Sequence, residues 1–338
     1  MMEPSGEADT KSNAGQAGED SGAAETPEPN PSVESTPDES PNTRRRGKRA
    51  ARARRGDADA AAPAAPKRPP ELTHRQRLAS LGYGALWLVG LRAVLLIVAG
   101  VLTSSPLLQP LGGALLVDIA AGRAGIAWTV LPDEGASSRR LIARRSFAAA
   151  GFLASIALAT IILSHGLGWA SLHPGKFDSM IVLSMLAVTA GAIRDEVFLR
   201  AFPLHFASRA GLPKRAAVVF AALLSPTAFL LTGASAANVT LSLTTGLLFA
   251  TIYAELGGAW PAIAAHAAWS LTIGPLVHGS ALEVSWTRGE LAAETSAAGP
   301  PAYVASALAL VGALVFVPKW AARLRATQAA PSGTPRPG

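Results

Sequence analysis

Residues 179–206 read SMIVLSMLAVTAGAIRDEVFLRAFPLHF, and a helix of about 20 such apolar residues is long enough to cross a bilayer. The middle of this run carries four charged residues, Arg194, Asp195, Glu196 and Arg200. A charge at the centre of a membrane helix costs roughly 2.5–3.5 kcal/mol, so four unpaired charges would cost about 10 kcal/mol. Because the four charges sum to zero, they can pair with one another. The run therefore predicts a membrane-spanning helix with a polar cluster inside it.

The rest of the chain repeats the apolar pattern and predicts an all-α, multi-pass transmembrane helical bundle. Seven runs are clear, and an eighth, Leu111–Leu131, is weaker because it carries Asp118 and Arg123. Cytoplasmic loops are enriched in Lys and Arg. Only if the weak run crosses do the basic clusters at 44–55, 139–145, 209–215 and 319–325 fall on one side. About eight spans are therefore expected, with both termini cytoplasmic. The other clear runs are Leu81–Leu102, Ser146–Leu163, Ala216–Leu231, Ala236–Tyr253, Ala259–Val277 and Ala302–Val317.

The N-terminal region, residues 1–77, differs in composition and is expected to be a disordered cytoplasmic tail. Up to Glu71 its only Leu, Ile, Val, Phe, Trp or Tyr residue is Val33, too little apolar surface to offset the entropy of ordering. Ten acidic residues precede eight Lys and Arg residues between Arg44 and Arg55. A basic cluster of this kind can bind nucleic acid or anionic lipid. Retention of the tail in the cytoplasm already accounts for it, so no nucleic-acid partner is expected. The predicted domains are the tail 1–77, a transmembrane domain 78–320 with its motif core at 179–276, and a short cytoplasmic tail 321–338.

Two predicted helices carry side chains that can do chemistry. Glu196 and Arg200 are four residues apart and can pair on one helix face, whereas Asp195 points about 100° away and can face a cavity. His266 and Ser270 are also four apart. Taken alone, the four charged residues are compatible with an ion-pair cluster that holds the helices together. Taken together with His266, they are candidates for a catalytic acid, a catalytic base or a group that stabilises an oxyanion. With no cysteine and a single histidine deep in a span, no metal and no cofactor are predicted.

These motifs resemble those of the CPBP family (CAAX proteases and bacteriocin-processing enzymes), which are intramembrane glutamic endopeptidases. The family's Glu-Glu-x-x-x-Arg is similar to Asp195-Glu196-x-x-x-Arg200, and its late His-x-x-x-Asn is similar to His266-x-x-x-Ser270. Eight helices also suit the family. The resemblance implies a peptidase in which Asp195 is the base that activates a water and Glu196 orients Arg200. It also implies that His266 and Ser270 hold the oxyanion.

Three positions depart from the family pattern. Asp195 stands for Glu, Ser270 stands for Asn, and the family's Phe-x-x-x-His falls on Phe229-Leu-Leu-Thr-Gly233, which puts glycine at the histidine position. Losing a positioned acid or base costs roughly 10²–10⁴-fold in rate. Two functions follow: a weakened or divergent endopeptidase, or a catalytically inactive relative that binds or scaffolds membrane partners. A transporter is a third class, but no paired broken helices or inverted repeat are visible.

The expected surroundings follow from the same resemblance and from the apolar runs. The partners are membrane lipids and a membrane-associated protein or peptide substrate. The expected location is the bacterial inner membrane.

Overall fold

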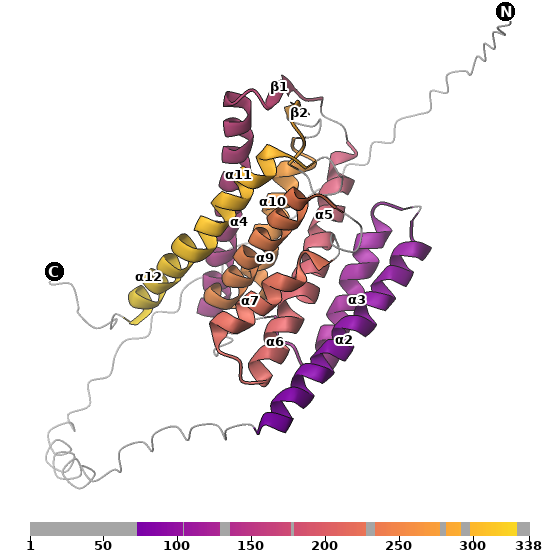
Figure 1. Ribbon diagram of the computed structural model, residues 1–338, viewed down its shortest axis with the longest axis vertical. Coiled ribbons are helices and arrows are strands. Elements are labelled where there is room, and N and C mark those ends of the chain that lie inside the picture. Colours follow the sequence, from indigo (N-terminus) through magenta and orange to yellow (C-terminus); the bar gives the residue numbers. More distant parts are fainter. Residues whose placement is uncertain are drawn as a thin grey trace, which may run out of the picture. The chain divides into compact units, whose positions relative to one another are not determined.

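The computed structural model describes residues 73–103, 105–128, 136–176, 179–227, 234–277, 282–291 and 298–329. As predicted, these residues are mostly helical, and the helices pack against one another (Figure 1). Most of the predicted N-terminal tail, residues 1–72, lies outside the described residues, as does the chain from residue 330 on.

The first two described helices, α2 (His74–Val101) and α3 (Leu108–Ala124), lie side by side (Figure 1). Helix α2 begins with a capping box in which Thr73 is the N-cap. Helix α3 ends before the predicted limit of Leu131. Gly125, with φ of 70°, adopts the left-handed conformation that commonly closes a helix.

A two-stranded ribbon follows α4 (Ala136–Gly166) and was not predicted. Strand β1 (Ala170–Pro174) pairs antiparallel with the distant strand β2 (Leu282–Trp286), with Ala170 opposite Trp286. Each strand has only five residues and its partner is more than 100 positions away, so neither stands out from a loop in the sequence. The fold is therefore a helical one with a small β ribbon.

A π-helical turn interrupts the segment that carries the four charges. Helix α5 (Ile181–Glu196), the π-helical turn η1 (Val197–Ala201) and α6 (Phe202–Arg209) run on without a break. A second π-helical turn, η2 (Gly312–Phe316), joins α11 (Pro300–Val311) to α12 (Val317–Ala329) in the same way. The last helix thus extends past residue 320, where the sequence predicted the cytoplasmic tail to begin.

Both π-helical turns end two residues before a proline, Pro203 or Pro318. Proline has no N–H for the carbonyl four residues back, and its ring collides with that carbonyl. A widened turn relieves the collision. The N–H of the residue before each proline donates instead to the carbonyl five residues back, at Val197 or Gly312.

Three further helices are α7 (Lys214–Leu224), α9 (Ala236–Leu256) and α10 (Ala259–Ile273). Gly257 and Gly258 turn the chain between α9 and α10 with φ of 98° and 119°, a region that favours glycine. Helix α10 packs against α4, α5 and α9, and its alanines permit that close approach.

Four of these helical segments are long and apolar enough to cross a membrane. Helices α3, α7 and α10 have 17, 11 and 15 residues, fewer than the roughly 20 that a perpendicular crossing needs. The α5–α6 segment is long enough but contains the four charged residues. The four candidate spans are His74–Val101, Ser138–Gly166, Ala236–Leu256 and Pro300–Ala326.

The outer surface of the helices is apolar, as a lipid-facing surface requires. On α2, Leu86 and Val89 are each 69% exposed and Ile97 is 65% exposed. Phe147 on α4 is 80% exposed. Water would solvate such a continuous apolar surface poorly, so it fits hydrocarbon surroundings.

Polar contacts gather the ends of several helices at one end of this group, here called the basic end. Glu255 at the end of α9 pairs with Lys214 of α7 at 2.9 Å and with Arg325 of α12 at 3.0 Å. Arg145, near the start of α4, donates a hydrogen bond of 2.9 Å to the Leu256 carbonyl. The basic end is therefore built by α4, α7, α9 and α12.

The helices α2 and α3 reach the same basic end. The N–H of Ala259, at the α9–α10 turn, donates to the carbonyl of Trp128, just after α3. At the start of α2, the Arg77 guanidinium lies beside Gly211, between α6 and α7. The β1–β2 ribbon, which follows the opposite ends of α4 and α10, lies at the other end.

Candidate functional site

The candidate site is centred on Glu196, the last residue of α5. Its side chain has no exposed surface, and its Oε1 lies 2.8 Å from Nδ1 of His266 on α10. The packing of α10 against α5 brings these two residues together, although 70 positions separate them in the chain. A carboxylate accepts and cannot donate, so the contact assigns the proton to Nδ1 of His266. The Nε2 atom of His266 then remains available for chemistry.

Arg200, one turn further along in η1, is the second partner of Glu196. Its Nη1 lies 3.6 Å from the same Oε1, and its side chain is 4% exposed. The Phe249 ring of α9 supports both partners. It stacks on His266 with ring centroids 4.8 Å apart and an angle of 15°, and the Arg200 guanidinium lies 5.5 Å from its centroid. Three helical segments thus enclose one carboxylate.

Two buried polar atoms in this cluster have no hydrogen-bond partner among the described residues. They are Oε2 of Glu196 and Nε of Arg200. Buried polar groups are nearly always bonded, and a polar site of this kind commonly holds an ordered water. The cluster therefore has unused hydrogen-bonding capacity for an ordered water.

Asp195 lies next to this cluster but in a more open position. Its Oδ1 accepts a hydrogen bond of 2.7 Å from Nε of Arg194, and both side chains are 31% exposed. It is also within electrostatic range of His266 and Arg200. Gly113 on α3 makes room for Arg194, because a Cβ there would come within 2.8 Å of its Cδ. Of the two acidic residues, Asp195 is the one that is accessible.

Ser270, a predicted site residue, is not part of the described contact network. Ser270 lies one turn beyond His266 on α10 and is partly buried. Within the described ranges no hydrogen bond or ion pair joins its side chain to Glu196, Arg200 or His266. Gly233, at the family's histidine position, lies outside the described residues, as does Phe229.

Phe249 and Tyr253 of α9 belong to the site and were not predicted from the sequence. Tyr253 is buried and within electrostatic range of Glu196. The two aromatic residues are four apart and so share a helix face. This spacing of two aromatic residues, in the predicted span just before His266, is the feature of the sequence that could have identified them as site residues. The π-helical turn η1 was not predicted either, and the feature of the sequence that indicates it is Pro203.

The arrangement is suited to proton transfer. A buried carboxylate that holds one nitrogen of an imidazole fixes its tautomer and stabilises the imidazolium when the other nitrogen takes a proton. An accessible carboxylate, Asp195, stands beside this pair. No group of three or more His, Asp or Glu side chains that could hold a metal ion is found within the described part of the chain.

A comparison with protein-family models matches residues 176–272 to the family described as "Rce1-like: Type II CAAX prenyl endopeptidase Rce1-like". No curated protein and no solved structure matches the chain. The matched residues run from the start of the α5 region to the end of α10 and include Asp195, Glu196, Arg200, His266 and Ser270.

The match confirms the family resemblance, and its description places the family among CAAX-type proteases with membrane-associated peptide or protein substrates. The four long apolar helices agree with that setting. This chain is therefore an integral membrane protein whose residues 176–272 match an Rce1-like family model, which is consistent with a member of the CPBP family.

Proposed function

We propose that the protein is an intramembrane endopeptidase that cleaves membrane-associated peptides or proteins with a water activated by an acidic side chain. The observation that carries the proposal is the buried Glu196–His266 contact of 2.8 Å. An enclosed acid that orients an imidazole, beside an accessible second acid, supports a catalytic role for this cluster.

The roles of the residues follow from their exposure. Asp195 is 31% exposed and has one oxygen outside the bond to Arg194, so it takes a proton from the attacking water. The hydroxide adds to the carbonyl carbon of the peptide, and Ser270 and the doubly protonated form of His266, which carries a proton on Nε2 as well as on Nδ1, donate hydrogen bonds to the oxyanion that forms. The C–N bond then breaks, and the amine leaves with a proton returned from the site. Glu196 cannot touch the substrate, because it is enclosed, and it positions His266 and Arg200.

We further propose that eight helical segments traverse the bacterial inner membrane, with both termini and the basic end cytoplasmic. Three observations support this arrangement. The starts of α2, α4 and α7 and the end of α9 meet at the basic end. The α4–α5 and α10–α11 connections pair as β1 and β2 at the other end. Lys and Arg mark the cytoplasmic side.

One observation favours a second function, that of an inactive relative which binds or scaffolds membrane partners. Both acids already have cationic partners: Asp195 is paired with Arg194, and Glu196 is paired with Arg200. The family's second histidine position is occupied by Gly233, and no histidine other than His266 contacts Glu196 within the part of the chain that the structure describes. A charge-paired cluster of this kind also serves to lock helices together.

A cleavage assay distinguishes the two functions. The full chain is reconstituted in liposomes with a library of membrane-embedded peptides, and products are detected by mass spectrometry. An active enzyme cleaves, and Asp195→Asn or His266→Ala lowers the rate about 10²–10⁴-fold. Asp118→Asn is the matched control, because Asp118 is an exposed carboxylate on α3 that forms no hydrogen bond or ion pair with Glu196, Arg200 or His266 among the described residues. Cleavage that Asp195→Asn leaves unchanged would exclude the proposed base.

A gain-of-function variant tests the missing histidine. Gly233→His with Asp195→Glu restores the family pattern at two positions and should raise the cleavage rate of a folded protein. Gly233→His with Asp195→Gln, which has no base at that position, should not. If wild type and both variants fold and none cleaves, the scaffold function is the better account.

A further inference from the structure

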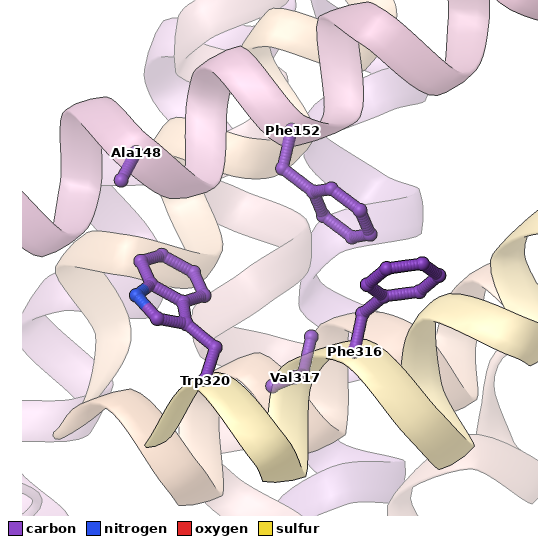
Figure 2. A pocket seen from close by; sticks show the side chains of 5 residues that line it. All are labelled: Ala148, Phe152, Phe316, Val317 and Trp320. Carbon is purple, nitrogen blue, oxygen red and sulfur yellow. The ribbon is translucent and has the colours of Figure 1, made fainter. Parts of the chain in front are cut away.

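A cavity of about 260 Å³ lies between α4 and the α11–α12 segment, away from the candidate site. Figure 2 shows Phe152 and Phe316 facing each other from the two helices, with Trp320 turned toward α4 near Ala148. The two phenyl rings have centroids 6.1 Å apart. Val317 completes a lining that is apolar except for the indole N–H. We call this cavity the α4–α12 groove.

Small residues and the second π-helical turn keep the α4–α12 groove open. Ala148 leaves space opposite Trp320. Gly312, the first residue of η2, allows Phe152 to approach, because a Cβ there would lie 3.1 Å from its ring. Phe316 is 58% exposed on a helix long enough to cross the membrane. The groove therefore opens toward the hydrocarbon and fits an alkyl chain.

Unpaired positive charge stands where the groove approaches the basic end. Arg144 lies one turn before Ala148, and Arg323 lies three residues after Trp320. At roughly 1.5 Å per residue, they stand about 6 Å and 4.5 Å beyond the groove, toward the same end. Both side chains are exposed, and neither has an ion pair among the residues that the structure describes.

The surroundings of these arginines do not neutralise them. Arg145 and Arg325, on the same two helices, are close enough to repel each other electrostatically. The acid nearby, Glu255, is already shared by Lys214 and Arg325. The end of the groove thus carries positive charge that an external anion can neutralise, and basic pockets between cytoplasmic ends of membrane helices are known sites for anionic lipid headgroups.

We propose that the α4–α12 groove binds an anionic phospholipid, with one acyl chain between Phe152 and Phe316 and the phosphate between Arg144 and Arg323. The apolar groove recognises the chain, and the two arginines recognise the charge. This site is separate from the Glu196 cluster and holds whether or not the protein cleaves peptides.

Lipid binding by the full chain in detergent micelles, measured by native mass spectrometry, tests the proposal. Phosphatidylglycerol and phosphatidylcholine with identical chains are compared. Each arginine contributes about fivefold, so Arg144→Ala with Arg323→Ala should weaken phosphatidylglycerol binding about 25-fold. Phosphatidylcholine binding should weaken much less, because the choline cation of that lipid offsets the charge of its phosphate. Arg215→Ala, an exposed arginine at the basic end but on α7, is the matched control and should behave as wild type.

A second pair of variants separates the groove from simple charge attraction, including attraction to the basic N-terminal region. Ala148→Phe keeps every charge but fills the groove, and it should weaken both lipids at least about fivefold. Ala143→Phe makes the same exchange at an exposed position about 140° away around α4 and should have no effect. Glycerol phosphate, which has the headgroup charge and no chain, should not displace the lipid.

Four results would overturn the proposal. The first three are equal affinity of wild type for the two lipids, displacement by glycerol phosphate, and unchanged binding in Ala148→Phe. A loss in Arg215→Ala as large as in the double arginine variant would assign the binding to general positive charge and would overturn it as well.

Discussion

Truncation of Arg200 to alanine removes a cation that lies 3.6 Å from the fully buried carboxylate of Glu196. Removing one member of a buried ion pair costs roughly 3–5 kcal/mol, because the other charge remains buried. Loss of the guanidinium above the Phe249 ring adds about 0.5–2 kcal/mol. The two losses together are about 3.5–7 kcal/mol. At about 2–4 °C per kcal/mol for a domain of 150–250 residues, the melting temperature should fall by roughly 7–28 °C.

Truncation of His266 provides the internal comparison. It removes a hydrogen bond to a charged group, worth roughly 1.5–3 kcal/mol, and a ring stack on Phe249 worth about 0.5–1.5 kcal/mol. Arg200 still neutralises Glu196 in this variant. Arg200→Ala should therefore be less stable than His266→Ala by about 1.5–2.5 kcal/mol.

The assay is thermal unfolding of the purified full chain in detergent, followed by tryptophan fluorescence. Arg200→Lys, which keeps the charge, should lose less than Arg200→Ala. Glu196→Gln combined with Arg200→Ala should be more stable than the sum of the single losses by about 1–3 kcal/mol, since no unpaired charge remains. If Arg200→Ala melts like the exposed control Arg215→Ala, Arg200 is solvated and the ion-pair reasoning is wrong.

Three further predictions concern topology, packing and the basic end. Because the chain has no cysteine, Ser171→Cys should react with an impermeant thiol reagent in intact cells, whereas Ser208→Cys should react only after the membrane is opened; the reverse pattern would invert the proposed orientation. Gly246→Ala should destabilise by about 1–3 kcal/mol, because its Cβ would collide with the Ser225 side chain, and Ser225→Gly should restore stability in the double variant. Glu255→Ala should cost only about 0.5–1.5 kcal/mol and lose its effect in high salt, because its two basic partners are more than half exposed; a salt-independent loss of several kcal/mol would contradict that view of the basic end.

Much of the helical structure could be predicted from the sequence because it depends on local properties. Apolar runs of about 20 residues have few alternatives to a helix in lipid, where each backbone polar group must be bonded within its own segment. The spacing of Glu196 and Arg200 likewise predicted their pairing, since residues four apart share a helix face. Helix ends were less predictable, as at α3, which closes at Gly125 rather than continuing to Leu131.

The β ribbon, the π-helical turns and the composition of the site depended on contacts that the local sequence does not display. Strand β1 can be recognised as a strand only from its pairing with β2, which is distant in the sequence. The two π-helical turns had a local cause in Pro203 and Pro318, but proline in a helix also produces simple kinks. Phe249 was an ordinary apolar residue of its span until the packing of α9 against α10 placed it under His266.

By itself the sequence determined that this is a membrane protein of many helices, that charges occur inside one of them, and that their motif resembles that of the CPBP family. Composition, hydrophobic length and residue spacing suffice for those conclusions because each acts within one segment. Only the tertiary structure decided which acid is enclosed and which is accessible. Glu196 and Asp195 are neighbours in the chain, but α10 covers one of them with His266 and leaves the other 31% exposed, and burial is a property of packing rather than of sequence position.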